Sequence, residues 1–449
     1  MALPIEKVIP SPYNLHMKKP VSAVCDHGFV EYFYSKNDVR SGILEFIVEG
    51  NSEHLILPSR TFLKLTLELS GKAVRPPAVQ GGRNVEVTFT DDPADDQPQA
   101  FVVNNIFHSI FESVDVYVSN QAITKTDKHN PYNAYIRTLC TYGSEPLDTY
   151  FELCGWSKDS AGEFDSLKSD KNTGLVTRNS MFTGVPHRGE FIGKICSPLF
   201  FQEKVLPTQT GLRVVLKKAS DDFTLVHENG NFELKIIEAT LMVQKIAAVP
   251  ALVEGYMKMM EEDHPLQYFL RTPSMNYYTI ENGSSQFMRD DLFMGRMPQR
   301  VIIGMVETEA YHGHKEKNPF NFQDFGLVEI CLYKDGIPYP RPPLKLDFAA
   351  NKCAEAYHNF MSSLGGAYSE HVVTVTKDDY TDGYFLVSYD MSPDQLGSVH
   401  PGNLLNMNSN IRLEMKFKEA VKQNITLLVY SETEHLMEIH RDRKVTVEF

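Results

Sequence analysis

"NPFNFQDFGLVEICLYKDGIPYPRPP" occupies residues 318–343 and combines the devices of a β-hairpin at a sheet edge. Three phenylalanines precede a short apolar strand at 327–333, which leads into an Asp335-Gly336 pair and a proline-rich run. Glycine adopts the positive φ that a tight hairpin turn requires, so this pair predicts such a turn. Prolines donate no ladder hydrogen bonds, so residues 338–343 must leave the sheet or follow its edge.

A weaker copy of this stretch, "NNIFHSIFESVDVYVSNQAI", occupies residues 104–123. At one constant shift of 214, six positions align without a gap: Asn104 with Asn318, Ile106 with Phe320, Phe111 with Phe325, Val114 with Val328, Val116 with Ile330 and Val118 with Leu332. Two blocks follow in the same order, 132–139 over 357–364 at a shift of 225 and 212–218 over 411–417 at a shift of 199. Short apolar strands also align by chance, but the shared order favours two β-domains of common design.

Alternation of apolar and polar residues dominates the rest of the chain. In "FLKLTLEL" (62–69) four leucines fall on one face, which predicts a half-buried strand. The same pattern recurs at 113–118, 212–218, 232–237, 299–306, 327–333, 371–377, 411–417 and 425–430. Short strands separated by turn residues predict an all-β sandwich or barrel.

Helical patterns are few and short. They predict helices over 130–143, 354–366 and 249–263. In the last of these, Leu252, Tyr256, Met259 and Met260 form an apolar stripe, which favours a connector helix packed on the core over a partner-binding groove. Residues 72–100 and 143–190 show no periodicity, and we expect long loops there.

The composition excludes several functional classes. The net charge of −14 opposes direct binding to nucleic acid, because such affinity depends on Lys and Arg contacts with phosphates. No apolar run is long enough for a signal peptide or a membrane span, so we expect a protein made in the cell interior. Six cysteines without a CxxC spacing predict buried thiols rather than a metal site.

Residue patterns with possible site chemistry all favour a structural interpretation. His312 and His314 could begin a metal site, but no cysteine or carboxylate at ligand spacing completes it. The acidic segment 90–96 lacks the Gly and distal Glu of a calcium loop. The phenylalanines of 318–343 favour a plug at one end of a sandwich over a substrate pocket. We therefore expect no catalytic residues, no cofactor-binding residues, no metal ligands, no cofactor and no enzyme activity.

Three stretches resemble a known family. "MPQRVIIGMV", "NPFNFQDFGLVEICLYKDGIPYPRPPLKLDF" and "AYHNFMSSLG" are similar to the second half of the double jelly-roll major capsid protein of Polinton (Maverick) elements and adintoviruses. "ILEFIVEGNSEHLILPSRTFLKLTLEL" (43–69) resembles the opening strands of that family. The resemblance implies an all-β chain of two tandem eight-stranded jelly rolls, with a few short helices and long loops. The first roll would span 1–248, a connector helix 249–263 and the second roll 264–449.

The resemblance also implies a function. Three chains would form a pseudo-hexagonal capsomer, and many capsomers would tile an icosahedral virion shell around double-stranded DNA. Penton and minor capsid proteins would be partners, and the loops at 72–100 and 143–190 would face the outer surface or neighbouring subunits. Two alternatives from other classes remain: a cellular tandem β-sandwich that binds carbohydrate or protein without assembling, and a jelly-roll enzyme.

Overall fold

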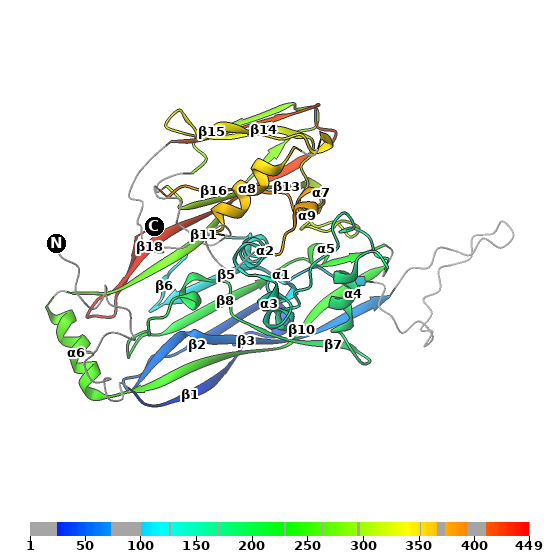
Figure 1. The fold of residues 1–449 in the computed structure, drawn as a ribbon. Coiled ribbons are helices and arrows are strands. Elements are labelled where there is room, and N and C mark those ends of the chain that lie inside the picture. Colours follow the sequence, from blue (N-terminus) through cyan, green and yellow to red (C-terminus); the bar gives the residue numbers. More distant parts are fainter. Residues whose placement is uncertain are drawn as a thin grey trace, which may run out of the picture.

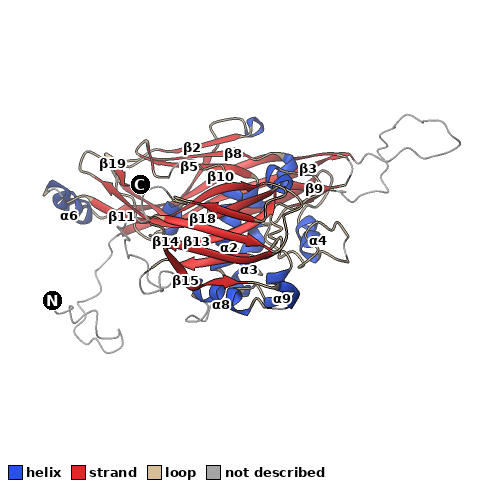
Figure 2. Cartoon of the chain, turned by 90° about the horizontal axis from the view of Figure 1, so that it is seen from above, coloured by secondary structure: helices blue, strands red, loops and turns tan. Residues whose placement is uncertain are grey.

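The chain forms two β-sandwich units joined by one helix (Figure 1). This computed structural model describes residues 25–72, 100–124, 127–168, 170–228, 230–262, 264–293, 297–350, 352–365, 373–392 and 410–448. The acidic segment 90–96 and nearly all of the expected loop 72–100 lie outside the described residues. Figure 2 shows strands through the centre of the molecule and helix α6 at one end.

The first unit contains two four-stranded sheets, β1-β10-β3-β7 and β2-β8-β5-β6. Their strands are β1 (Cys25–Tyr34), β2 (Ile43–Val48), β3 (His54–Lys72), β5 (Phe111–Val118), β6 (Gln121–Ala122), β7 (His187–Gly193), β8 (Leu212–Lys218) and β10 (Asn231–Ala248). A small additional sheet pairs β4 (Ala100–Val102) with β9 (Leu225–His227).

The second unit repeats this topology with sheets β11-β18-β13-β16 and β12-β17-β14-β15. Its strands are β11 (Leu266–Ile280), β12 (Gln286–Arg289), β13 (Arg300–Glu307), β14 (Leu327–Lys334), β15 (Ile337–Lys345), β16 (Leu386–Asp390), β17 (Ile411–Phe417) and β18 (Ile425–Ile439), and β19 (Val445–Glu448) adds to β18. Counted along the chain, the eight shared strands of each unit pair first-eighth-third-sixth and second-seventh-fourth-fifth. The predicted pair of eight-stranded jelly rolls is therefore confirmed.

The helices are short and connect or cover the sheets. They are α1 (Ile106–Ser109), α2 (Asn130–Thr141), α3 (Ser144–Leu147), α4 (Thr173–Ser180), α5 (Asp221–Thr224), α6 (Pro250–Glu261), α7 (Thr308–His312), α8 (Ala354–Ser363) and α9 (Lys377–Thr381). Single 3₁₀ turns occur at η3 (Val39–Ser41), η4 (Tyr150–Cys154), η5 (Pro198–Phe201) and η6 (Phe348–Ala350). The three helices predicted from the sequence correspond to α2, α6 and α8. Among the helices described, none has the length and apolarity needed to cross a membrane.

The hairpin predicted at 334–337 is present. Asp335 and Gly336 both have positive φ, 51° and 79°, and Lys334 pairs with Ile337 across a two-residue turn. The following strand β15, which carries the prolines, lies at the edge of its sheet, as their missing N–H groups require. The first unit forms the equivalent turn at 119–120, also with two positive φ values.

The register of the paired strands corrects one predicted alignment. The equivalent turns at 119–120 and 335–336 are 216 positions apart, so Val116 corresponds to Leu332, and these two lie opposite Val214 and Leu413. Leu413 follows Val214 by 199 positions, as predicted, whereas the predicted shift of 214 is wrong by two residues between β5 and β14. A slip of two leaves the same side chains facing inward, so alternation alone could not detect it.

Two other expectations differ from the structure. The strand predicted at 371–377 is wrong over its described part, because Thr376 caps α9 and forms a capping box with Asp379. Val373 and Val375 are buried beside this helix start without joining a strand. The expected loop 143–190 contains α3, η4, α4 and the start of β7, so local helices interrupt it.

Candidate functional site

The junction between the two units is built from aromatic rings. Tyr135 on α2 of the first unit stacks on Phe320 of the second, with ring centroids 4.2 Å apart and an interplanar angle of 2°. Tyr132, one turn earlier on α2, meets Phe320 edge to face at 5.5 Å. Phe320 and Phe322 are fully buried. Phe320 packs against α2 of the first unit, so these rings help to hold the two units together.

Phe325 differs from the other two phenylalanines of the quoted stretch. Its ring is only partly buried, and its backbone has a φ of +48° at the bend before β14. Phe325 therefore packs against the core with lower burial than Phe320. Residue spacing could not separate the two, because burial here depends on where α2 of the other unit lies.

Polar contacts add to the junction beside these rings. The Lys158 ammonium donates to Asp379, at 2.6 Å, and to the carbonyl of Thr374. The hydroxyl of Tyr384 donates to the carbonyl of Asp159 at 2.7 Å. Residues 158–165 therefore contact the second unit, while the role of the loops 72–100 and 143–190 at the outer surface or at neighbouring subunits stays a prediction.

An ion pair with no solvent exposure anchors that segment. Arg178 on α4 lies 2.7 Å from Asp159, and both side chains are fully buried. Arg178 also donates to the carbonyls of Val102 and Ser157, and Asn172 donates to Asp159. Buried charges are tolerated only when paired and hydrogen-bonded in this way. The network therefore holds Asp159 in place at the start of the segment 159–165, which contacts the second unit.

Burial of His108 on α1 gives the fold a pH dependence. The pKa of His108 is lowered to about 3, mainly by burial and also by the Arg137 guanidinium. An unfolded chain binds this proton below about pH 6.5. The unfolded state therefore holds the extra proton between about pH 3 and 6.5, and stability falls as the pH drops through that range.

We expect His108→Gln to flatten this acid sensitivity. At about pH 4.5 the shift of His108 corresponds to about 3 kcal/mol of lost stability in the parent protein, which the variant should not lose. Urea unfolding at about pH 7 and 4.5 measures the difference for both proteins. An equal loss in parent and variant would contradict the assignment.

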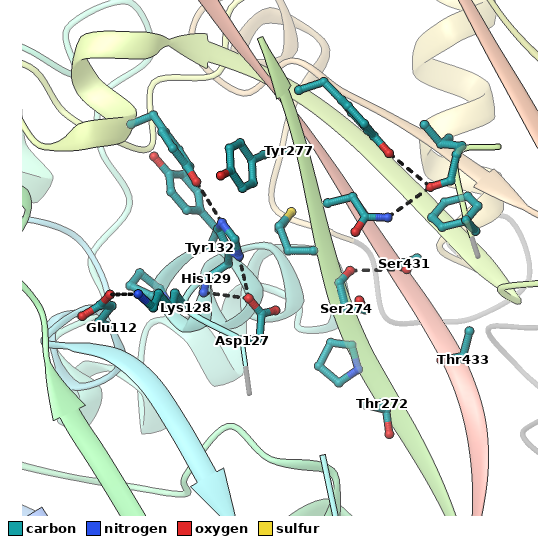
Figure 3. Close-up of a pocket in the computed structure, with 18 of the residues that line it drawn as sticks. Glu112, Asp127, Lys128, His129, Tyr132, Thr272, Ser274, Tyr277, Ser431 and Thr433 are labelled. Carbon is teal, nitrogen blue, oxygen red and sulfur yellow. Dashed lines mark hydrogen bonds and ion pairs between the residues drawn. The ribbon is translucent and has the colours of Figure 1, made fainter. Parts of the chain in front are cut away.

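A groove of about 1020 Å³ opens between the two units beside the junction (Figure 3). Its wall from the first unit includes the start of α2, and its wall from the second includes β11, β18 and α7.

His129 spans the two units: its Nδ1 lies 2.5 Å from Asp127 and its Nε2 lies 2.8 Å from the hydroxyl of Tyr311. Burial raises the pKa of Tyr311 well above its usual value. This tyrosine therefore keeps its proton, and the chain of three side chains orients rings rather than activating a nucleophile.

The two histidines considered as metal ligands have different surroundings. His312 lines the groove, whereas the Nδ1 of His314 accepts a hydrogen bond from the backbone of Glu316. Within the described ranges, no group of three or more His, Cys, Asp or Glu side chains is arranged to hold a metal ion.

An exposed apolar row on the first unit was not anticipated. Val30, Tyr32 and Tyr34 on β1 are 43%, 59% and 76% exposed, although β1 is an edge strand of its sheet. Tyr32 lies opposite Met242, which lies opposite Phe62, so the row continues across three strands. The signal was present as alternation in "FVEYFY" (29–34), but alternation does not say which face is buried. Exposed apolar rows of this kind mark association surfaces.

The predicted apolar stripe on α6 is only partly buried. Met260 is buried, and the hydroxyl of Tyr256 lies 2.8 Å from the Thr208 side chain of the first unit. Arg443 of the second unit contacts the sulfur of Met257. Met259 remains 56% exposed. The helix thus connects to both units, as expected of a connector, with one methionine left at the surface.

Comparisons with known proteins extend the fold assignment. No family model matches the chain. An uncharacterized protein of Caenorhabditis elegans is 23% identical over 411 residues, which is 89% of this chain and 91% of the relative. A chain of the Sputnik virophage structure is similar at a TM-score of 0.63 and 11% identity, covering 98% of this chain and 92% of that chain. The mavirus major capsid protein is similar at 0.53 and 11% identity, covering 100% and 95%. At such identities the likeness establishes the fold, which is the double jelly roll.

Proposed function

We propose that this chain is the major capsid protein of a double-stranded DNA virus or virus-like element related to Polintons and adintoviruses. The observation that carries the proposal is the fusion of two jelly rolls of identical strand order through a buried junction. Similarity to virophage capsid structures over nearly the whole chain supports it. The animal source of the relative supports a copy that resides in a host genome.

The proposed mechanism is assembly rather than catalysis. With a first roll at 1–248, a connector helix at 249–263 and a second roll at 264–449, the chain would have two units of similar structure whose edges differ. Three chains would then approximate six-fold symmetry in a closed trimer, while the distinct edges let capsomers tile an icosahedral shell. The net charge of −14 fits a shell whose genome is neutralised by other, basic proteins. The chain would reside in the virion, with penton and minor capsid proteins as further partners.

Light scattering after size exclusion tests the proposal. A capsid subunit should elute as a trimer of about 150 kDa, three copies of the 51.0 kDa chain, and electron microscopy should show hexagonal arrays or shells. A stable monomer that forms no arrays would instead favour the non-assembling binding module.

The exposed row on β1 supplies a prediction about the trimer. We expect Tyr32→Asp to weaken self-association by about tenfold or more, because a charge would replace a tyrosine that the proposed trimer contact buries. Sedimentation measures the association, and the thermal unfolding temperature of the monomer should not change. Tyr150→Asp is the matched control, since Tyr150 is also exposed (43%) but lies on η4. Equal weakening by both variants would argue against β1 as the contact.

A further inference from the structure

One contact between the two units places a helix against an edge strand. Helix α2 lies between the fifth and sixth shared strands of the first unit and packs against β11, the first strand of the second unit. His129, at the start of α2, meets Tyr277 of β11 with ring centroids 5.3 Å apart. Asn130 and Asn133 line a small cavity together with Pro273 of β11. These three polar residues at the start of α2 therefore lie at the contact with the second unit.

The second unit carries a helix at the same place in its topology. Helix α8 also lies between the fifth and sixth shared strands of its unit, and the repeat alignment at a shift of 225 places it over α2. Ten of the twelve residues of α2 are buried, whereas in α8 only Ala356, Phe360 and Ser363 are. Each helix packs on its own unit, and α2 is also covered by the neighbouring unit. Helix α8 therefore keeps an open side.

The open side of α8 is the counterpart of the side that α2 turns to β11. Three residues of α8 are exposed, Ala354, Glu355 and His358, and the other seven are buried or half-buried. At the shift of 225 these three correspond to the three residues of α2 that lie at the contact with β11. The surface that the first unit uses for contact within the chain is thus present and uncovered on the second unit.

Strand β1 is the counterpart of β11 and is also uncovered. Each is the first strand of its unit and an edge strand of the equivalent sheet. Five residues of β11 are buried, whereas none of residues 27–34 of β1 is. In Figure 1, α8 lies on the upper unit and β1 on the far side of the lower unit, so the two cannot meet within one chain. The chain therefore makes one contact between a helix and an edge strand, and leaves the equivalent helix and strand exposed.

The two exposed surfaces complement each other chemically. Glu355 is the acidic residue of α8, and residues 36–40 after β1 expose two basic side chains, Lys36 and Arg40, with one acidic side chain, Asp38. Opposite charges on facing surfaces steer association and fix its register. The exposed tyrosines of β1 supply the aromatic area that such contacts favour.

We propose that α8 of one copy packs against β1 of a second copy, as α2 packs against β11 within the chain. The side of α8 at Glu355 and His358 meets the row formed by Tyr32 and Tyr34. Glu355 lies beside Lys36. The contact is head-to-tail, so each copy offers α8 to one neighbour and β1 to the other, and such a contact can close into a ring. This inference rests on the proposed capsid function and assigns the surfaces by which the trimer forms.

Photo-crosslinking of the full-length chain tests the contact. Benzoylphenylalanine in place of His358 should cross-link to a peptide within residues 27–40 of another copy. The product is a band of two or more chains on a denaturing gel, and mass spectrometry identifies the peptide. Met288 is the matched control position, since it is 59% exposed on β12 of the same unit but lies outside α8, and it should give no cross-link to 27–40.

Charge reversal tests the two partners independently. Glu355→Lys should weaken self-association by about fivefold or more, because it places a positive charge beside Lys36 and Arg40. Lys36→Glu should also weaken association when made alone, yet it should restore part of the loss when combined with Glu355→Lys. Sedimentation measures each association. Glu254→Lys, at an exposed residue of α6, is the control and should have no effect.

The outcomes separate this inference from the proposed function. A trimer by light scattering in which position 358 does not cross-link to 27–40 would overturn the pairing of α8 with β1 and leave the capsid proposal in place. Equal weakening by Glu355→Lys and Glu254→Lys, without recovery on adding Lys36→Glu, would also overturn the pairing. A protein that remains monomeric would contradict both the pairing and the capsid proposal.

Discussion

Arg178→Met is expected to lower the free energy of unfolding by about 3–5 kcal/mol, because it leaves Asp159 buried without its charged partner. Both side chains of this pair have zero exposure, and Arg178 also satisfies the carbonyls of Val102 and Ser157. The loss should appear as a lower urea midpoint. Because the Asp159 carbonyl and the preceding Lys158 contact Tyr384 and Asp379, the junction between the units should also open more readily to proteolysis.

The matched control is Arg188→Met. Arg188 lies 2.8 Å from Glu68, close to the 2.7 Å of the buried pair, but its side chain is 50% exposed, so about 0–1 kcal/mol should be lost. In a double variant, Asp159→Leu should recover part of the loss caused by Arg178→Met, since no unpaired charge then remains buried. If Arg178→Met and Arg188→Met lowered the free energy of unfolding by similar amounts, burial would not determine how much an ion pair of this protein stabilises it.

Phe320→Ala is expected to cost about 3–5 kcal/mol, because it removes a fully buried ring from the junction. The ring stacks in parallel on Tyr135 and meets Tyr132 edge to face, contacts that add to the area it buries. Thermal unfolding should therefore begin at a lower temperature, and the yield of soluble protein should fall.

Phe325→Ala provides the comparison within the same stretch. Its ring is partly buried, so the loss should be nearer about 1 kcal/mol, the centre of the distribution for ordinary substitutions. Calorimetry of both variants measures the difference. If Phe325→Ala proved as costly as Phe320→Ala, the junction would not be the place where this stretch stabilises the protein.

The sequence by itself determined the strands and the tight turn. Alternation located β5, β8, β14 and β17, and the Asp335-Gly336 pair located a hairpin with two positive φ values. These features depend on neighbours a few residues away, and their signals are therefore local. The order of the repeated blocks predicted two units of common design, and the strands of the two units do pair in the same order.

Local signals failed where two conformations satisfied the same pattern. "HVVTVTK" (371–377) alternates like a strand, yet Thr376 and Asp379 cap α9 instead. The repeat alignment of β5 with β14 was off by two residues, and alternation cannot detect such a slip. Likewise, "FVEYFY" (29–34) alternates without indicating that its tyrosine face at Tyr32 and Tyr34 is exposed.

Only the tertiary structure decided which residues of the two units meet. Tyr135 and Phe320 are 185 positions apart in sequence, and Lys158 and Asp379 are 221 apart. No period or motif encodes such pairs, because their contact depends on how two complete sandwiches pack around α2. The groove lined by β11 exists for the same reason: a cavity between two folded units is a property of their packing and of no single segment.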